Sequence, residues 1–530
     1  MAIELVRPRP GGRGTIGRSA RPLAALAVAG LVLSACGGGG GAGSGGPTGA
    51  VADDFSEQGE PVDGGTISVG LEAETNSWLP GEGTFSGAGT TVAYALYDPL
   101  VKRTADGELK PYLAEAVTPD EGLTAWTLEL RPGATFHDGT PLDAQALKTV
   151  FDQYLRAPGA KTAATLSEVV SLDVVDDLTV RYTLGAANAA FPDVLTGPAG
   201  WPFSPTAAAE AGPDAGANPV GTGPFRFVSW QRDSTLEVEK NEDYWQEGLP
   251  HLDGITFRPI PDEDTRLASL QSGDIDVLQT LRGASVGRAP ELDGVDNYEY
   301  LGNMSGAPLI NTTRAPFDDA RVRQALAYGI KAEDVIAVNS AGLTEPASQY
   351  VSPDSPFFSE RAAEAWPSFD TGKAQEVYDQ YVNDPQRSDG KPVGSPVSFT
   401  YNCPPDPTLN EASQLYQAFW AALGMDVQIQ AVEQATLIQN GINHAYDVQC
   451  FRVSSDRDPY YIFRDAFTPG ALNFTGYTDE LVDDQLEVLR TSTDVQVRKD
   501  TVETISLHLA EAVPNLFTGY RSPTWPCRRT

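Results

Sequence analysis

One short pattern in the sequence could build a catalytic nucleophile. Residues Gly283 to Gly287 match G-x-S-x-G, the turn that exposes the serine of an α/β-hydrolase, and Ser285 takes the place of that serine. The hydrolase turn needs a helix directly after the serine, but Pro290 follows within a few residues. Glycine is abundant, with 52 residues in the chain, so such a short match arises easily by chance. We therefore keep a serine hydrolase that uses Ser285 only as a less favoured hypothesis for the function.

The histidines do not indicate a metal site. The chain has 4 of them, and none shows the H-E-x-x-H or paired spacing of zinc ligands. His137 lies beside Asp138, where we expect a turn residue with a structural role. The phosphate-binding pattern G-x-x-x-x-G-K-[S/T] does not occur, which argues against an ATPase. We expect no metal, no other cofactor and no catalytic residue.

Composition limits the partners. The chain has 530 residues, of which 41% are hydrophobic and 9% aromatic, enough for two or more folded domains. Its formal net charge of −35 argues against binding to nucleic acid, which needs a basic face. The same charge argues against docking on anionic lipid through the protein surface.

The first residues form a targeting segment. Residues 1–35 contain five arginines, an apolar stretch from Leu23 to Val32 that is too short to span a bilayer, and the sequence Leu-Ser-Ala before Cys36. This order is similar to a bacterial lipoprotein signal, in which Cys36 would carry the lipid; ordinary secretory cleavage near Ala35 is the alternative. Residues 36–62 are rich in glycine and predict a flexible tether. We therefore expect a protein anchored by lipid on the extracytoplasmic face of the cell membrane.

The stretch from Asn218 to Gln279 predicts an α/β fold. Pro and Gly residues at 219–224 indicate a turn, and two alternating stretches after it predict a hairpin. A third strand, a helix that ends at Gly273 and a strand up to Leu278 then predict a βαβ unit. Residues 397–453 repeat the order strand, helix, strand, so a second α/β region follows.

Several motifs together resemble the family 5 solute-binding proteins, the extracytoplasmic receptors of peptide and nickel ABC importers. The matching stretches are RPGATFHDGTP at 131–141, NPVGTGPF at 218–225, NEDYW at 241–245, SGDIDV at 272–277 and RAPFDDARVRQALAYGI at 314–330. They occur in the family's order, and the likeness covers roughly 64–520. The resemblance implies an α/β protein with the two-lobed, type II periplasmic-binding-protein-like fold, a hinge between the lobes and an extra subdomain in lobe I.

The resemblance also implies the domain boundaries. Lobe I would span 63–310, with the inserted subdomain at about 96–190, and lobe II would span 311–512. Residues 513–530 would return to lobe I. They end in the basic sequence Cys527-Arg-Arg-Thr, where the family usually continues, so we expect a truncated or frame-shifted end.

Asp456 is the strongest candidate for ligand chemistry. It matches an aspartate that pairs with the α-ammonium group of the ligand in peptide-binding members of the family. A buried carboxylate facing an ammonium group makes charge-assisted hydrogen bonds. The alternative is a turn or helix cap before Pro459. Arg452, on the preceding strand, could meet a ligand carboxylate, although it has no fixed counterpart in the family and an exposed or structural arginine is the alternative.

Further residues join the candidate site through the loops and strands that the resemblance places at the cleft. Asn76 and Trp78 lie in the loop after the first strand, and Trp201 lies in a Gly/Pro-rich loop. Tyr401 and Asn402 end the strand that begins at Val397. Cys403 and Cys450, at strand ends of lobe II in an exported protein, predict a disulfide.

These observations predict a monomeric receptor that captures short peptides in a cleft between the lobes. Closure of the hinge around the ligand would create the state that an ABC permease and its ATPase subunits recognise. The same fold also serves other solutes, so a receptor for an oligosaccharide or a nickel chelate is the second alternative. Contact with the membrane would be through the lipid anchor only.

Overall fold

The computed structural model describes residues 61–528, apart from 105–106, 157–160, 281–284, 286–287, 300–303, 341, 343, 455–456, 471 and 522–523. All of these residues belong to one compact unit of the chain, Gly49–Thr530. In this part of the chain, no helix combines the length and the apolar character needed to cross a membrane.

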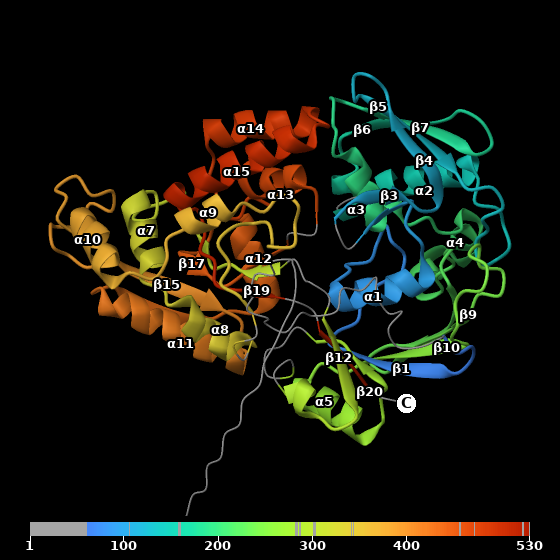
Figure 1. The fold of residues 1–530 in the computed structure, drawn as a ribbon, viewed down its shortest axis with the longest axis horizontal. Helices are drawn as coiled ribbons and strands as arrows, with labels where there is room; N and C mark the ends of the chain where they lie inside the picture. The colour runs from blue at the N-terminus through green and yellow to red at the C-terminus, as the bar shows by residue number, and fades with distance from the viewer. Residues whose placement is uncertain are drawn as a thin grey trace, which may run out of the picture. The chain divides into compact units, whose positions relative to one another are not determined.

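The largest sheet has seven strands in the order β12-β20-β11-β1-β10-β9-β8. Strand β1 pairs in parallel with β10 on one side and β11 on the other, and the remaining pairs are antiparallel. The strands are β1 (Thr66–Leu71), β8 (Phe225–Gln231), β9 (Thr235–Lys240), β10 (Gly254–Pro259), β11 (Val277–Leu278), β12 (Val295–Glu299) and β20 (Thr524–Arg528). Two strands near the two ends of the described chain, β1 and β20, therefore lie in one sheet (Figure 1).

The predicted βαβ unit is confirmed as β10, α5 (Glu263–Ser272) and β11. Helix α5 begins because the Asp262 carboxylate accepts the Thr265 N–H, and it ends at Gly273, whose φ of +83° favours glycine. A second helix, α1 (Gly87–Leu96), follows β1 and begins at Ser86, whose side chain accepts the Gly89 N–H. Both helices connect to strands at the same sheet.

A four-stranded antiparallel sheet, in the order β4-β5-β7-β6, forms the inserted region. Helix α2 packs on β6 and β7 with the side chains that helical spacing predicts, and Asp143 accepts the Ala146 N–H at its start (2.7 Å). The elements of this region are β2 (Val101–Arg103), β3 (Leu109–Pro111), β4 (Ala114–Pro119), β5 (Ala125–Leu130), α2 (Ala144–Arg156), α3 (Lys161–Thr165), β6 (Val169–Val174), β7 (Thr179–Leu184) and α4 (Pro205–Ala211).

The second half of the chain has its own sheet in the order β14-β17-β15-β16, in which β15, β16 and β17 are parallel. Helices α7, α8, α10 and α11 lie around this sheet, and α13, α14 and α15 form a separate layer (Figure 1). The elements are β14 (Leu309–Ile310), α7 (Ala320–Tyr328), α8 (Ala332–Ser340), α9 (Glu360–Ala365), α10 (Thr371–Val382), β15 (Ser398–Cys403), α11 (Pro407–Ala422), β16 (Asp426–Ala431), α12 (Gln434–Ile442), β17 (Val448–Gln449), α13 (Pro459–Phe467), α14 (Glu480–Thr491) and α15 (Val495–Ala512).

The chain passes twice between its two halves. One passage runs from β12 to β13 (Met304–Gly306), and the other from β19 (Tyr520–Arg521) to β20. Strand β12 pairs with β20, and β13 pairs with β19 and with β18 (Arg452–Ser454). This double crossing agrees with the predicted two-lobed fold, whereas the exact lobe boundaries stay a prediction.

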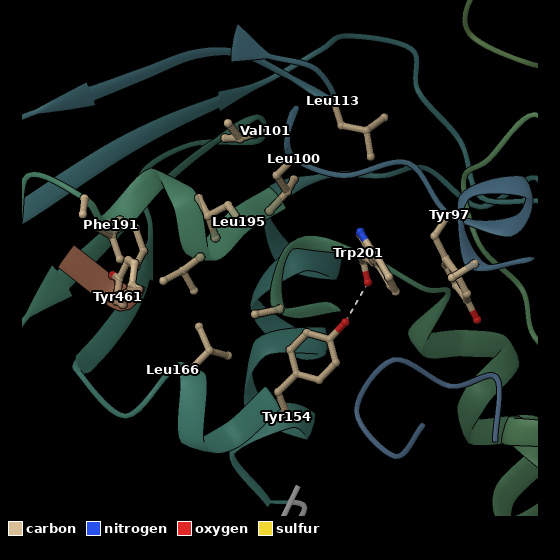
Figure 2. Packing of buried hydrophobic residues seen from close by; sticks show 14 of the residues in the cluster. Tyr97, Leu100, Val101, Leu113, Tyr154, Leu166, Phe191, Leu195, Trp201 and Tyr461 are labelled. Carbon is tan, nitrogen blue, oxygen red and sulfur yellow. Dashed lines mark hydrogen bonds between the residues drawn. The ribbon is translucent and has the colours of Figure 1, made fainter. Parts of the chain in front are cut away.

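Two hydrophobic clusters contain most of the buried apolar side chains, and the first of them extends from the first half of the chain into α13, α14 and α15. In the first, Trp201 stacks nearly parallel to Tyr97, with 6.4 Å between the ring centroids, and its carbonyl accepts the Tyr154 hydroxyl (2.7 Å; Figure 2). The second core packs Tyr401, Tyr416 and Trp420 between the second sheet and α11.

Candidate functional site

The ends of the parallel strands are the first places to examine for a binding site. In open α/β sheets, ligands bind beyond the carboxyl ends of the strands. The carboxyl end of β11 leads directly into Gln279, while β15 ends with Asn402 and Cys403 and β17 ends with Gln449. Each of these ends therefore carries at least one carboxamide side chain.

Asn402 and Gln449 lie opposite each other on neighbouring parallel strands. Side chains in register on neighbouring strands point to the same face of the sheet. Gln449 is fully buried, and Asn402 is 5% exposed. Within the described residues, neither Nε2 nor Oε1 of Gln449 has a hydrogen-bond partner, and neither does Oδ1 of Asn402. We refer to Asn402 and Gln449 as the carboxamide edge.

Unpaired carboxamide atoms at full burial are uncommon, because each costs about 1–3 kcal/mol of folding free energy. Helix α12 comes close to this face, and a Cβ atom added at Gly441 would lie 3.2 Å from Nε2 of Gln449 and 3.1 Å from the Phe474 ring. A larger residue at 441 would therefore crowd Gln449. The carboxamide edge thus has α12 close on one side and offers a donor and two acceptors that have no partner among the described residues.

A disulfide lies directly beyond the carboxamide edge. Cys403 and Cys450 are joined, with 5.2 Å between their Cα atoms, and each follows one of the two carboxamide residues in the sequence. Because side chains alternate along a strand, the sulfur atoms lie on the opposite face, where Cys450 contacts the second core. The ends of β15 and β17 are therefore linked covalently as well as through the sheet.

Gln279 occupies the corresponding place in the first sheet. Its side chain is 2% exposed, its N–H donates to the Gly70 carbonyl (2.9 Å), and its Oε1 has no partner within the described residues. Its Nε2 lies beside the start of α1, 3.6 Å from where a Cβ atom of Gly87 would stand. A helix start presents N–H groups and a partial positive charge. This edge thus also combines donors with an unpaired acceptor.

The predicted site residues of the first lobe have other neighbours. Trp78 and Trp201 are both 1% exposed, and other aromatic rings surround them in the first core. Both rings therefore pack within this core, although neither indole N–H has a partner in the described part of the chain. Asn76 is exposed, and its Oδ1 accepts the Thr84 N–H (2.9 Å), which orders the loop before α1.

The predicted residues of the second lobe divide into three groups. Asn402 belongs to the carboxamide edge, whereas the Tyr401 ring packs in the core on the opposite face and cannot reach the same ligand. Arg452 is an exposed residue of β18, paired with Gly306 of β13. Asp456 lies outside the described residues, as does Cys36 near the start of the chain.

Ser285 shows no catalytic arrangement in the residues that the structure describes. The side chain is 1% exposed, and the backbone N–H donates to a carboxylate oxygen of Glu263 (2.8 Å). The remaining residues of the G-x-S-x-G pattern lie outside the described part. All four histidines have polar contacts elsewhere in the fold, at Gly223, Asp63, Asn473 and Asp479. Among the described residues, no group of three His, Cys, Asp or Glu side chains is placed to hold a metal ion.

The stretch with the most recognisable motif forms a saturated hydrogen-bond network rather than a site. We refer to residues 218–224 as the glycine loop. The Gly221 N–H donates to Nδ1 of His137 (3.2 Å), and Nε2 of His137 donates to the Gly223 carbonyl (3.0 Å). The Gly221 contact needs an unprotonated Nδ1, and burial lowers the pKa of the imidazole to about 4, against the opposite effect of the Gly223 carbonyl. A Cβ atom at Gly221 would lie 2.0 Å from the Leu96 carbonyl oxygen, so only glycine fits there.

Asp98 lies beside the glycine loop and is 4% exposed. Its N–H donates to the Thr222 hydroxyl (3.2 Å), and its carboxyl accepts the Trp245 indole N–H (2.6 Å) and the Tyr244 hydroxyl (3.2 Å). Burial raises the pKa of this carboxyl to about 7, against the opposite effect of the two hydrogen bonds. The NEDYW motif therefore serves to bind a buried acid within the first lobe.

The sequence analysis did not identify Gln449 or Gln279. The signal at Gln279 was its place directly after the apolar pair Val277-Leu278, whereas Gln449 follows only one apolar residue, Val448. A polar residue in a buried stretch is informative when no partner is available to it. Only the structure could show that the partner is lacking among the described residues.

The comparisons with known proteins agree with this fold. The model of the bacterial extracellular solute-binding proteins, family 5, middle region, matches residues 108–474. The chain is similar to the glutathione-binding protein GsiB of Pectobacterium atrosepticum, with 33% identity over 351 residues, which span 65% of each chain. The match thus covers slightly less than two thirds of that relative.

Solved structures show the same fold at lower identity. The protein NikA of Brucella suis, in complex with Fe(III)-EDTA, matches with a TM-score of 0.76 and 20% identity, over 88% of this chain and 95% of NikA. The periplasmic binding protein DppA of Helicobacter pylori, in complex with the peptide STSA, matches with a TM-score of 0.75 and 21% identity, over 90% and 96%. The chain therefore belongs to the bacterial extracellular solute-binding proteins of family 5, and it is a binding protein rather than an enzyme.

Proposed function

We propose that this chain is the lipid-anchored receptor of an ABC importer and captures short peptides between its two lobes. The observation that carries the proposal is the carboxamide edge. Gln449 is fully buried at the carboxyl end of a parallel strand. Neither its Nε2 nor its Oε1 has a hydrogen-bond partner among the described residues. A peptide group offers one N–H and one C=O, the two partners that a carboxamide needs.

Charge selection at the ligand ends is the second part of the proposal. Asp456, which follows β18 in the sequence, would pair with the ligand ammonium group, and Arg452 would meet its carboxylate. The relative in P. atrosepticum is by name a glutathione-binding protein, and the DppA structure holds the peptide STSA. Both names support a small peptide rather than a larger polymer as the solute.

Hinge closure and delivery to the permease are a further part of the proposal. The pairing of β12 with β20, and of β13 with β19, supports a hinge where the chain passes between its halves. Closure would bring the carboxyl ends of the strands in both sheets onto one ligand. The closed form would then be the one that the permease of the importer recognises.

Anchoring through Cys36 is the remaining part of the proposal, supported by the apolar stretch and small residues before it. Export of the Cys36→Ser variant in a bacterial host tests it. We expect the protein to leave the membrane fraction, since a single lipid-bearing residue would hold it there. Retention of the variant in washed membranes would contradict the anchor.

The peptide proposal is tested by identifying what the protein carries. Native mass spectrometry of gently purified protein should show the mass of a short peptide, and calorimetry with glutathione and trialanine should then show binding. The nickel–histidine chelate and maltotriose serve as the competing solutes. Binding of either competitor, with none of glutathione or trialanine, would replace peptide with chelate or sugar as the solute.

A further inference from the structure

The carboxamide edge has a feature that a purely structural role does not explain. In a folded protein, a buried glutamine normally contributes through hydrogen bonds made by both ends of its amide. Gln349 behaves in this way, because its Nε2 donates to the Ser359 carbonyl (2.9 Å) and its Oε1 accepts the Ser359 N–H (3.4 Å). Gln449 is buried even more completely and makes neither bond to any described residue.

The unpaired state of Gln449 does not depend on how its amide is oriented. The oxygen and the nitrogen of a carboxamide can be exchanged by a half-turn, which often changes the apparent pairing. Here both atoms lack partners among the described residues, so the half-turn leaves one unpaired donor and one unpaired acceptor in the same places. Asn402 adds a second acceptor from the neighbouring strand in register.

The surroundings keep these groups in place. Gly441 lies against the Gln449 amide on the α12 side, and the Cys403–Cys450 disulfide joins the two strands one residue further on. An apolar residue of the same size, such as methionine, would fill this space without unpaired polar atoms. The retained amide therefore decreases the stability of the unliganded protein, a sign of a binding group.

From these observations we propose that Gln449 and Asn402 read a backbone amide of the ligand. Gln449 accepts the N–H of one peptide group and donates to a C=O, while Asn402 accepts a further N–H or O–H. This assignment rests on the proposed peptide function, and it adds which chemical group of the peptide the protein recognises. Recognition at this edge depends on a hydrogen-bonded amide, and a ligand charge has no role in it.

Two glutamine variants test the unpaired state without any ligand. Gln449→Met removes two unpaired buried atoms, so we expect its melting temperature to rise by about 2–4 °C or more. Gln349→Met, the matched control, removes two existing hydrogen bonds and should melt at a lower temperature. A fall in the melting temperature of Gln449→Met similar to that of the control would mean that Gln449 is paired within the protein, and would overturn the assignment.

A double-mutant cycle tests the ligand side. The probes are trialanine and its two analogues with a single N-methylated peptide nitrogen, measured by calorimetry. We expect one analogue to bind the wild-type protein at least about tenfold more weakly, and Gln449→Met to bind trialanine about tenfold more weakly as well. That analogue should lose little further affinity in Gln449→Met, because the two changes remove the same hydrogen bond. In the control variant Gln349→Met, N-methylation should weaken trialanine binding by the same factor as in the wild-type protein.

The possible failures are distinguishable. If trialanine binds but N-methylation costs the same in wild type and Gln449→Met, the amide assignment is wrong and the peptide function remains. If neither trialanine nor glutathione binds the wild-type protein, the proposed peptide function fails, and the amide assignment fails with it.

Discussion

The glycine loop and the carboxamide edge treat their polar groups in opposite ways. Around the glycine loop, both ring nitrogens of His137 have hydrogen-bond partners. The Asp98 carboxyl accepts hydrogen bonds from Tyr244 and Trp245, and the Asp98 N–H donates to the Thr222 hydroxyl. At the carboxamide edge, a fully buried glutamine has no partner among the described residues. The first region uses its hydrogen bonds to fix the fold, whereas the second leaves polar atoms unpaired within the described part of the chain, as the proposed ligand site requires.

This difference changes how the motifs of the family are understood. The motifs that make the chain recognisable lie where the backbone approaches itself closely, as at Gly221, where a Cβ atom would lie 2.0 Å from the Leu96 carbonyl oxygen. Such positions define the scaffold, on which solutes can change. The groups that select a solute are then expected at strand ends with ordinary residue types, where no motif marks them.

The largest expected effect is on the binding side of the comparison. We hypothesise that Asp456→Asn lowers the affinity for trialanine by about two to three decades, because breaking one side of a desolvated charge pair costs about 3–5 kcal/mol. Calorimetry of both proteins measures it. The control is Asp458→Asn, since Asp458 caps α13 and pairs with Arg498 (2.5 Å), so this variant should lose stability and keep its affinity. Equal trialanine affinity of Asp456→Asn and wild type would assign Asp456 to a turn instead.

A pH-dependent effect is expected on the scaffold side. The folded pKa of Asp98, about 7, lies above its unfolded value of 3.8, so its contribution to stability is complete below pH 3.8 and is lost as the pH rises through 7. Asp98→Asn removes this dependence. The difference in unfolding free energy between wild type and Asp98→Asn should therefore fall by about 4 kcal/mol between pH 4 and pH 8. Urea unfolding across this range measures it, and a constant difference would show that Asp98 ionises normally.

His137 should give the opposite slope. Its folded pKa of about 4 lies below the ordinary value of 6.5, so its contribution is complete above pH 6.5 and is lost as the pH falls to 4. We expect wild type to lose about 3 kcal/mol relative to His137→Gln over this interval. Urea unfolding at pH 4.5 and pH 7.5 measures the change, and trialanine affinity at pH 7.5 should be the same for both proteins. A variant that binds more weakly would give His137 a part in the site.

The smallest effect concerns packing at the glycine loop. Gly221→Ala should lower the unfolding free energy by about 2–3 kcal/mol, because the added methyl group overlaps the backbone of α1. Gly197→Ala is the control, since φ at Gly197 is −111° and a Cβ atom there meets nothing within 4 Å. Thermal unfolding of the two variants compares them. Two equally stable variants would indicate that the loop can move away from α1.

Much of the fold could be predicted from local patterns. The βαβ unit from β10 to β11 and the apolar face of α2 follow from the spacing of apolar residues and from single capping residues. Details that depend on tertiary contacts differ. Within the stretch 397–453, predicted as strand, helix and strand, helix α11 begins at Asp406, which accepts the Leu409 N–H (3.0 Å) ahead of Pro407. The end of the same stretch is divided into β17 and β18, which pair in different sheets.

The candidate site was less accessible to sequence reasoning. Asn402 and its neighbour Tyr401 share one strand, yet the pleat places Asn402 at the carboxamide edge and Tyr401 in the core. Aromatic residues such as Trp78 and Trp201 suggest ligand platforms by type, but enclosure by other rings makes them part of the core. Burial and pairing decide these roles, and both are properties of the folded chain rather than of the residue.

The disulfide between Cys403 and Cys450 has a consequence for how the receptor matures. It fixes the separation of β15 and β17 one residue beyond the two carboxamides, so a ligand would not have to order them on binding. In a reducing cytoplasm the chain would lack this constraint, and we expect it to hold peptides more loosely there. Formation of the Cys403–Cys450 disulfide in an oxidising compartment would then raise the affinity for the solute.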